Sequence, residues 1–343
     1  MKFQAHLPHR EMDSGQELKE MISCVLLYYR HHKNQKEIAQ HLGLSHSKVS
    51  RLLKRAYGEG IVRVELNLPQ LPRLETALIE QFGLRDAVVI PGGLGEYTKE
   101  ELGWTAARYF ERVAANGIKV GLSCGYTLYH TIKNLREHHF RDLKIYPLSA
   151  ESTLTLVDLF PNTLVGMMAA KYRPHVTAYA LHAQLIAPLE EIDRERKLLL
   201  QNQEIRRILE EAGNVDVALL GIGSIGRDTP GFCTLAEFFG VRPDQLLALE
   251  VVGEINYQPF DAQGKIVERE ELRKLTSRVL AVPASRLREL SRQYGKSVIA
   301  VAGGAKKAPS IRGVLTGGYC NILITDEEAA LALLDGLPSG SHP

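Results

Sequence analysis

Apolar side chains near the N-terminus recur at the spacing of a helix. The recurring positions are Leu18, Ile22, Val25, Leu26 and Tyr29. Positions three or four apart share one face of a helix, so this pattern predicts a first helix that buries one stripe against its neighbours.

The next stretch, QKEIAQHLGLSHSKVSRLLKRAYGEGIVRVEL at residues 35–66, has the pattern of two short helices joined by a tight turn. Two helices cross closely where a small residue lies at the crossing, and the turn needs a residue that tolerates a positive φ. Ala39 and Gly43 meet these two requirements, while Val49 and Leu52 lie on the inner face of the second helix. The pattern predicts a helix-turn-helix.

Polar side chains occupy the outer face of the second helix. Ser45 can cap it, because its hydroxyl can accept a hydrogen bond from a backbone N–H of the first turn. Short polar groups there can read base edges in the major groove, and the later cations can bind phosphates. The residues expected to contact DNA are Ser45, His46, Ser47, Lys48, Ser50, Arg51, Lys54 and Arg55. The alternative is an ordinary helical hairpin with a solvated basic face.

The end of this stretch and its charge both favour DNA binding over that alternative. Residues 58–60, GlyGluGly, are expected to end the helix, and the alternation of IVRVEL at residues 61–66 predicts a wing strand. Residues 1–63 contain 11 Lys/Arg and 6 Asp/Glu, a net charge of +5, so the whole-chain value of +2 leaves −3 for the remainder. A basic segment on a mildly acidic body indicates a nucleic-acid contact at one end.

Composition and length predict two globular domains, at residues 1–68 and 69–337. The chain has 343 residues, of which 45% are hydrophobic and 24% charged, as in ordinary globular proteins. No apolar run is long enough to cross a membrane and the N-terminus lacks the apolar core of a signal peptide, so we expect a cytoplasmic protein. The four cysteines are far apart, which argues against disulfides and a zinc site and predicts small buried residues.

Beyond residue 69, apolar runs alternate with helical stretches. A helical pattern with Leu71, Leu74, Leu78 and Phe82 could serve as core, as a short dimer seam, or as both. The runs expected to form strands are DAVVIPGG, IKVGLSCG, LKIYPLSA, VDVALLGIG, KSVIAVAGG and CNILITD, and a helix is expected through Ala106 and Phe110. Short, nearly unbroken Val/Ile/Leu runs predict strands buried on both faces, and hence a mostly parallel α/β sheet. Ligands of such sheets bind at the carboxyl ends of the strands.

Two glycine-rich loops follow predicted strands. In GLSCGYTL, residues 121–128, Gly121 and Gly125 permit close approach of a ligand to the backbone, and Ser123 and Thr127 supply hydroxyl groups. A phosphate fits the start of the helix that follows, although a tight turn without a ligand explains the same residues. GIGSIG, residues 221–226, has the spacing of a dinucleotide-binding fingerprint, but the sequence after it does not begin a helix. A sugar-facing or purely structural loop is favoured there, with Gly223 as the candidate contact.

Two later loops supply further polar candidates. After the double glycine of VAGGAKK, Lys306 and Lys307 could meet a phosphate or carboxylate, although adjacent lysines usually lie in solvent. In the turn GEINYQPFDAQGK, Asp261 could accept hydrogen bonds from a sugar hydroxyl or simply stabilise the turn.

Taken together, these segments resemble the SorC family of sugar-responsive transcriptional regulators, from about Leu18 to Leu334. The resemblance rests on the helix-turn-helix, GLSCGYTL, ALLGIGSIG, GEINYQPFDAQG and GGAKKAPSIRGVLTGGYCNILITDEEAALALL in this order. It implies an effector domain related in fold to sugar-phosphate isomerases and deaminases. It further implies a phosphorylated sugar or polyol as effector, homodimers or homotetramers, and effector-controlled affinity for operator DNA.

The family's phosphate loop corresponds here to Gly121, Ser123, Gly125 and Thr127, and its lysine after the double glycine corresponds to Lys307. Where the family often has a glycine-rich segment, this chain has SAESTLTLVDLFP at residues 149–161, so the contacts to the sugar are not carried over. Thr153 and Asp158 lie in that segment.

The leading interpretation is a two-state oligomer whose effector changes the spacing or orientation of paired DNA-reading helices. No cofactor is expected. The competing class is a sugar-phosphate isomerase or deaminase that carries a DNA-binding appendage. Such an enzyme needs a positioned acid or base. The unassigned candidates are His130, Asp158, Asp216 and Glu254, which form no recognisable constellation in the sequence.

Overall fold

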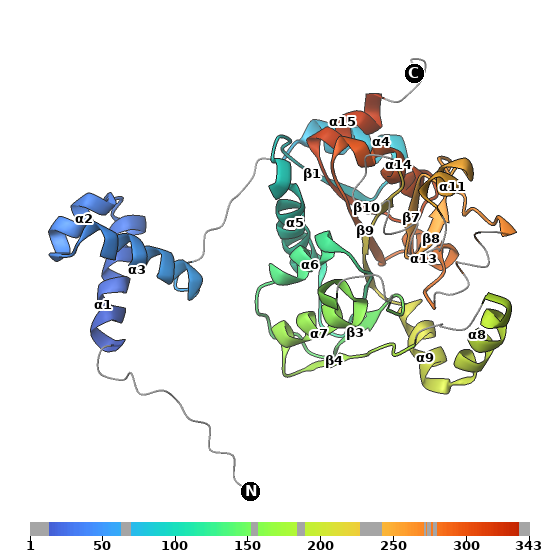
Figure 1. Cartoon of the computed structure of the whole chain (residues 1–343), viewed down its shortest axis with the longest axis horizontal. Helices are drawn as coiled ribbons and strands as arrows, with labels where there is room; N and C mark the ends of the chain where they lie inside the picture. The colour runs from blue at the N-terminus through green and yellow to red at the C-terminus, as the bar shows by residue number, and fades with distance from the viewer. Residues whose placement is uncertain are drawn as a thin grey trace, which may run out of the picture. The chain divides into compact units, whose positions relative to one another are not determined.

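The computed structural model describes residues 14–62, 70–151, 157–183, 189–226, 242–270 and 280–335, together with positions 272 and 276. The chain divides into two compact units, residues 1–67 and residues 68–343 (Figure 1).

The N-terminal unit is helical. Its elements are α1 (Ser14–Val25), a short π-helix (Leu26–Arg30), α2 (Gln35–Leu42) and α3 (His46–Gly58). The side chain of Asn34 caps α2, and Gly43 ends α2 in the left-handed conformation, with φ +65°. Ser45 Oγ accepts a hydrogen bond from Lys48 N at 3.2 Å and so caps α3. The predicted helix-turn-helix is therefore confirmed, including its turn glycine and its serine cap.

The stripe predicted for the first helix is wrong. The helix buries Met21 and Cys24 against Ile38 and Leu52 of the next two helices. Of the predicted stripe, Val25 packs against this core, whereas Leu18, Ile22, Leu26 and Tyr29 lie on the outside and are each exposed by 40% to 44%. Both sets of residues fit a helical period, so spacing alone could not decide which face is inward.

The end of α3 also follows the prediction. The helix ends at Gly58, and Gly60 has a φ of +72° that suits glycine. Val62 packs into the core of the unit. Residues 63–69 lie outside the described residues, and with them most of the predicted wing strand.

The C-terminal unit is built on a seven-stranded sheet. Its strands are β1 (Asp86–Ile90), β2 (Lys119–Leu122), β3 (Leu143–Pro147), β4 (Val176–Ala178), β5 (Val217–Gly221), β9 (Ser297–Val301) and β10 (Ile322–Asp326). The spatial order is β1-β10-β9-β5-β2-β3-β4, and every neighbouring pair is parallel. All six predicted strands are present. The seventh, β4, has three residues and two of them are exposed, so it lacks the apolar run by which the others were recognised.

Helices cover both faces of this sheet (Figure 1). One face packs against α5 (Thr98–Val113), α6 (Tyr126–Lys133) and α7 (Pro161–Tyr172). The other packs against α4 (Pro72–Phe82), α9 (Gln203–Ala212), α13 (Ala284–Arg292), α14 (Ala308–Thr316) and α15 (Glu327–Asp335). Strand side chains are buried on both faces, which explains the near-continuous apolar runs of the sequence. In α4, Leu71, Leu74, Leu78 and Phe82 pack against this core.

The remaining elements are short. They include α8 (Ile192–Gln201), α11 (Pro243–Ala248) and 3-10 helices at Gly95–Tyr97, Val157–Leu159, Leu189–Glu191 and Ala305–Lys307. A small antiparallel sheet joins β6 (Gly223–Ser224), β7 (Gly253–Ile255) and β8 (Gln258–Phe260). No helix in the described part of the chain is long and apolar enough to cross a membrane.

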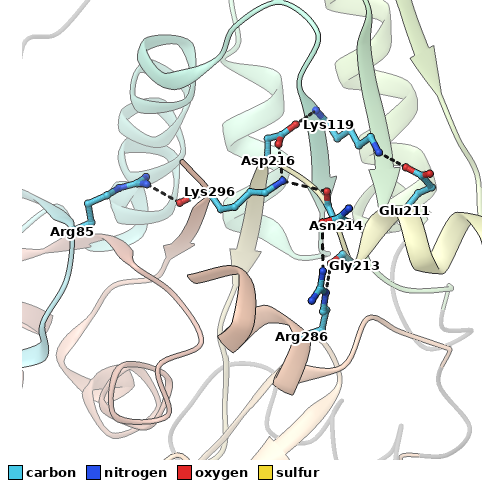
Figure 2. A network of polar contacts seen from close by, with 8 residues as sticks. All are labelled: Arg85, Lys119, Glu211, Gly213, Asn214, Asp216, Arg286 and Lys296. Atoms are coloured by element: carbon cyan, nitrogen blue, oxygen red, sulfur yellow. Dashed lines mark hydrogen bonds and ion pairs between the residues drawn. The ribbon is translucent and has the colours of Figure 1, made fainter. Parts of the chain in front are cut away.

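Ion pairs and hydrogen bonds link the amino-terminal ends of neighbouring strands of the main sheet (Figure 2). Asp216 accepts a hydrogen bond from Lys119 N at 2.8 Å and pairs with Lys296 Nζ at 2.7 Å. These residues begin or directly precede β2, β5 and β9. The same edge is extended by the ion pair between Lys119 and Glu211 and by the hydrogen bond from Arg85 to Lys296 O at 2.6 Å. Asp216, a candidate acid in the sequence, therefore has a structural role at the edge opposite the carboxyl ends of the strands.

Replacing Asp216 by Ala should lower the free energy of unfolding of the C-terminal unit by about 1–3 kcal/mol, because the Lys119 amide and the Lys296 ammonium both lose their partner. Chemical denaturation of the full chain measures this change. The matched control is Asp335→Ala at the exposed end of α15, which should alter stability by no more than about 0.5 kcal/mol. Equal effects of the two substitutions would contradict the structural role of Asp216.

Candidate functional site

The outer face of α3 is the candidate DNA-reading surface. Val49, Leu52 and Leu53 face the core of the N-terminal unit. The exposed residues of the helix and its cap include Ser45, His46, Ser47, Ser50, Arg51 and Lys54. Hydroxyl groups thus precede two cations along one solvent-facing surface, which is the arrangement that a recognition helix needs.

Two of the predicted DNA contacts are engaged within the unit. Lys48 Nζ lies 2.6 Å from Glu20, and Arg55 lies 2.7 Å from Glu17 and 2.5 Å from Glu59. Glu17 and Glu20 belong to α1, so these pairs hold α3 against the first helix. Lys48 and Arg55 therefore differ from Arg51 and Lys54, whose side chains face solvent.

The second candidate site lies where the order in which the chain adds strands to the main sheet changes direction. From β2 the chain proceeds through β3 to β4 towards one edge, and from β5 it proceeds through β9 to β10 towards the other. The connections that leave the carboxyl ends of β2 and β5 therefore diverge, and the region between them is the crevice that this topology implies. Such a topological switch point is where open α/β sheets bind their ligands.

The connection after β2 presents the start of a helix to this crevice. Ser123 is buried, its amide donates to Leu219 O at 3.1 Å, and its hydroxyl lies 3.5 Å from the Asn256 amide oxygen. Gly125 has a φ of +117°, which side chains disfavour, and α6 begins at the next residue. Thr127 lies in the first turn of α6 and is partly exposed. The predicted strand-to-helix loop is present, and its open backbone N–H groups can receive an anion.

Gly121 differs from the other residues of this loop. It lies inside β2, where an added Cβ would be 2.6 Å from Leu148 Cδ2 and 3.2 Å from Val215 Cγ2. The prediction that Gly121 lets a ligand approach is therefore corrected: the glycine makes room for Leu148 in the core.

Lys307 reaches the crevice from the connection after β9. Its ammonium donates to Ile222 O at 2.9 Å, directly after β5, whereas the side chain of Lys306 is exposed. Burial lowers the pKa of Lys307 to about 8, with a smaller lowering by Lys99 and an opposing effect of Glu254. The Asp326 carboxylate accepts from Gly304 N at 2.6 Å and so fixes the double-glycine turn. The structure thus distinguishes the two lysines, which the sequence could not.

Glu254 is the residue that the sequence left unassigned at this site. Its carboxylate accepts a hydrogen bond from Tyr257 N at 2.6 Å and lies against Gly223, where a Cβ would collide with it. Burial raises the pKa of Glu254 to about 7, while the Tyr257 amide and Lys307 favour its ionised form. Gly223 is therefore glycine because Glu254 occupies the space beside it, and it begins strand β6 rather than a helix. This setting departs from that of a dinucleotide-binding fingerprint.

Cys124 belongs to the β2 connection and lies near Glu254. Burial raises the pKa of its thiol to about 11, and the Glu254 carboxylate adds to the increase. A thiol with a raised pKa is a weak nucleophile, so Cys124 contributes shape and not reactivity.

Asp261 does not join the crevice. Its carboxylate accepts from Gln263 N at 3.0 Å and Lys265 N at 2.9 Å, which closes the turn after β8. The turn packs near Gly313 and Gly317, towards the end of α14 remote from Lys307. Of the two roles considered for Asp261, the structure shows the turn-stabilising one, and the predicted sugar contact is corrected.

The other acid–base candidates are dispersed. Asp158 is exposed in the 3-10 helix before α7, and His130 packs on α6 against Gly103, with burial lowering its pKa. Thr153 lies outside the described residues. Asp158, His130 and Asp216 thus lie on different elements and are not brought together with Glu254 at the switch point.

The N-terminal unit is a helix-turn-helix with exposed cations. The C-terminal unit brings a lysine and a helix N-terminus to the switch point of its sheet. These two features define a ligand-responsive DNA-binding regulator. Comparison with known proteins supports this class. The family described as "Putative sugar-binding domain" matches residues 68–335, and the chain belongs to it. Residues 21–58 match the helix-turn-helix family described as sigma-70, region 4.

The similar proteins of known role are bacterial transcriptional regulators. The deoxyribonucleoside regulator of Bacillus subtilis is 28% identical over 320 residues, 92% of this chain and 97% of that protein. The sorbitol operon regulator of Klebsiella pneumoniae is 29% identical over 331 residues, 94% of this chain and all of that protein. The crystal structure of the latter, SorC, covers 92% of this chain and 98% of its own with a TM-score of 0.69. The chain is thus a SorC-type transcriptional regulator.

Proposed function

We propose that this protein is a cytoplasmic regulator of carbohydrate metabolism whose affinity for operator DNA is controlled by a phosphorylated sugar or polyol. The DNA-binding domain would span residues 1–68, and residues 69–337 would bind the effector and form a homodimer or homotetramer. Leu18 and Ile22 of α1 and Leu26 and Tyr29 of the π-helix after it are exposed, and this apolar row supports a further self-association through the DNA-binding domain, because four large side chains otherwise stay in water.

One observation carries the proposal for the effector. The Lys307 ammonium is held at the switch point by Ile222 O, in the crevice that also receives the first turn of α6. A cation and a helix N-terminus together suit a phosphate monoester. Gly125 and Thr127 would hold the phosphate with Lys307, and Ser123 would support the loop from within through its bonds to Leu219 and Asn256. Glu254 would accept a hydrogen bond from a hydroxyl group of the sugar.

The names of the relatives support a sugar-related effector but differ among themselves. They are a sorbitol operon regulator, a deoxyribonucleoside regulator and the transcriptional regulator LsrR of Escherichia coli. A phosphate group held by the same loop is the shared chemistry that we propose, with the sugar end left free to vary.

Lys307→Met should weaken binding of a phosphorylated sugar by roughly 10- to 100-fold, because a charge-assisted hydrogen bond is lost. Thermal-shift screening of sugar phosphates against the full chain identifies a ligand, and calorimetry then gives both affinities.

In the wild type, the affinity for the sugar phosphate should fall as the pH rises through about 8, where Lys307 loses its proton. Lys306→Met is the matched control and should bind normally. Normal binding by Lys307→Met would place the phosphate elsewhere.

On the DNA side, we propose that Ser47, Ser50, Arg51 and Lys54 make the direct contacts. Lys48 and Arg55 would act mainly through their ion pairs with α1.

The double variant Arg51→Ala/Lys54→Ala should lose at least about tenfold in operator affinity, with a salt slope reduced by about two. Fluorescence anisotropy over a range of salt concentrations, with an operator selected from random duplexes, measures both quantities. Lys265→Ala/Arg292→Ala removes the same charge from exposed positions of the other unit and should leave both unchanged. An unaltered slope in the first variant would refute α3 as the contact.

A further inference from the structure

Helices α5 and α6 begin side by side at the carboxyl edge of the main sheet. Gly103 of α5 packs so closely on His130 of α6 that a Cβ there would collide with the His130 side chain. One turn earlier in both helices, Lys99 Nζ lies 5.3 Å from the centre of the Tyr126 ring. Tyr126 directly follows Gly125 and is the first residue of α6. Lys99 is therefore held beside the loop in which the effector's phosphate is proposed to lie.

Lys99 also lies near the other cation of the site. Its positive charge contributes to lowering the pKa of Lys307, and likewise that of His130. Among the described residues, no carboxylate lies within ion-pair distance of the ammonium of Lys99 or of Lys307. Glu254 acts on Lys307 at longer range. The structure therefore places the positive charges of Lys99 and Lys307 near each other without a carboxylate of the described part of the chain paired to either ammonium group.

This arrangement favours binding of an anion. Two like charges repel each other, and the positive ends of α5 and α6 add to the potential at the same edge. A group with two negative charges relieves the repulsion better than a carboxylate or an uncharged hydroxyl does. Lys99 and Tyr126 are both exposed, so the lysine can leave the ring and turn to a ligand.

We propose that Lys99 is a second cation for the effector's phosphate, opposite Lys307, and that this pair selects a dianionic phosphate over carboxylates and unphosphorylated sugars. The proposal rests on the function proposed above and deepens it. Lys307 approaches from the connection after β9, and Lys99 approaches from the first turn of α5. The phosphate would lie between them at the first turn of α6.

Calorimetry of the full chain with inorganic phosphate at pH 7 tests the proposal. Lys99→Gln should weaken phosphate binding by about five- to tenfold, as expected for the loss of one partly screened charge. Lys99→Arg should retain most of the affinity, because the charge is kept. Lys306→Gln, an exposed lysine of the neighbouring turn, should bind like the wild type. A parallel titration with acetate should respond little to Lys99→Gln.

The outcomes separate the two proposals. Loss of phosphate binding in Lys307→Met with normal binding in Lys99→Gln would overturn the role of Lys99 and leave the proposed function standing. No phosphate binding by the wild type, or equal binding by the wild type and Lys307→Met, would overturn the anion site itself. Equal weakening by Lys99→Gln and Lys306→Gln would show a general charge effect and would also overturn the role of Lys99.

Discussion

The organisation of the C-terminal unit depends on one constraint, the reversal of chain direction between β2 and β5 in a fully parallel sheet. Helices must cover both faces of such a sheet, and the connections from these two strands must leave in opposite directions. The reversal opens a crevice at which α6 begins without a side-chain cap, and the first N–H groups of a helix have no acceptor within it. Every group that we assign to the effector site reaches this crevice: the β2 connection directly, Lys307 through the turn after β9, and Glu254 through β7.

Charged residues at the amino-terminal ends of the strands have a different role from those at the carboxyl ends. At the amino-terminal edge, Asp216 and Lys296 have partners at hydrogen-bonding distance and hold strands together (Figure 2). At the carboxyl edge, Glu254 and Lys307 have pKa values displaced towards neutrality by burial. Displaced pKa values often mark catalytic sites, but they also arise wherever a site excludes water in order to bind a charged ligand. The regulators to which the chain is similar favour binding.

Much of this fold was predictable from the sequence, because its signals are local. Six strands are continuous apolar runs, and the helix-turn-helix depends on single residues such as Gly43 and Ser45, whose conformations follow from their chemistry. Predictions failed where the answer depended on distant packing. The inward face of α1 is set by α2 and α3, and Gly121 is set by Leu148, which directly follows β3. Glu254 lies in the segment GEINYQPFDAQG but no spacing links it to the β2 connection, and Lys99 lies in no motif, so only the folded chain brings them there.

The central claim is that effector binding and operator binding are coupled, and reciprocity tests it most directly. If the effector changes operator affinity by some factor, the operator must change effector affinity by the same factor. Calorimetric titration of the identified sugar phosphate into the full chain, with and without saturating operator, measures this factor. The account predicts two different affinities whose ratio, typically about 5 to 150, equals the effector's effect on DNA affinity. Identical affinities with and without operator would contradict it.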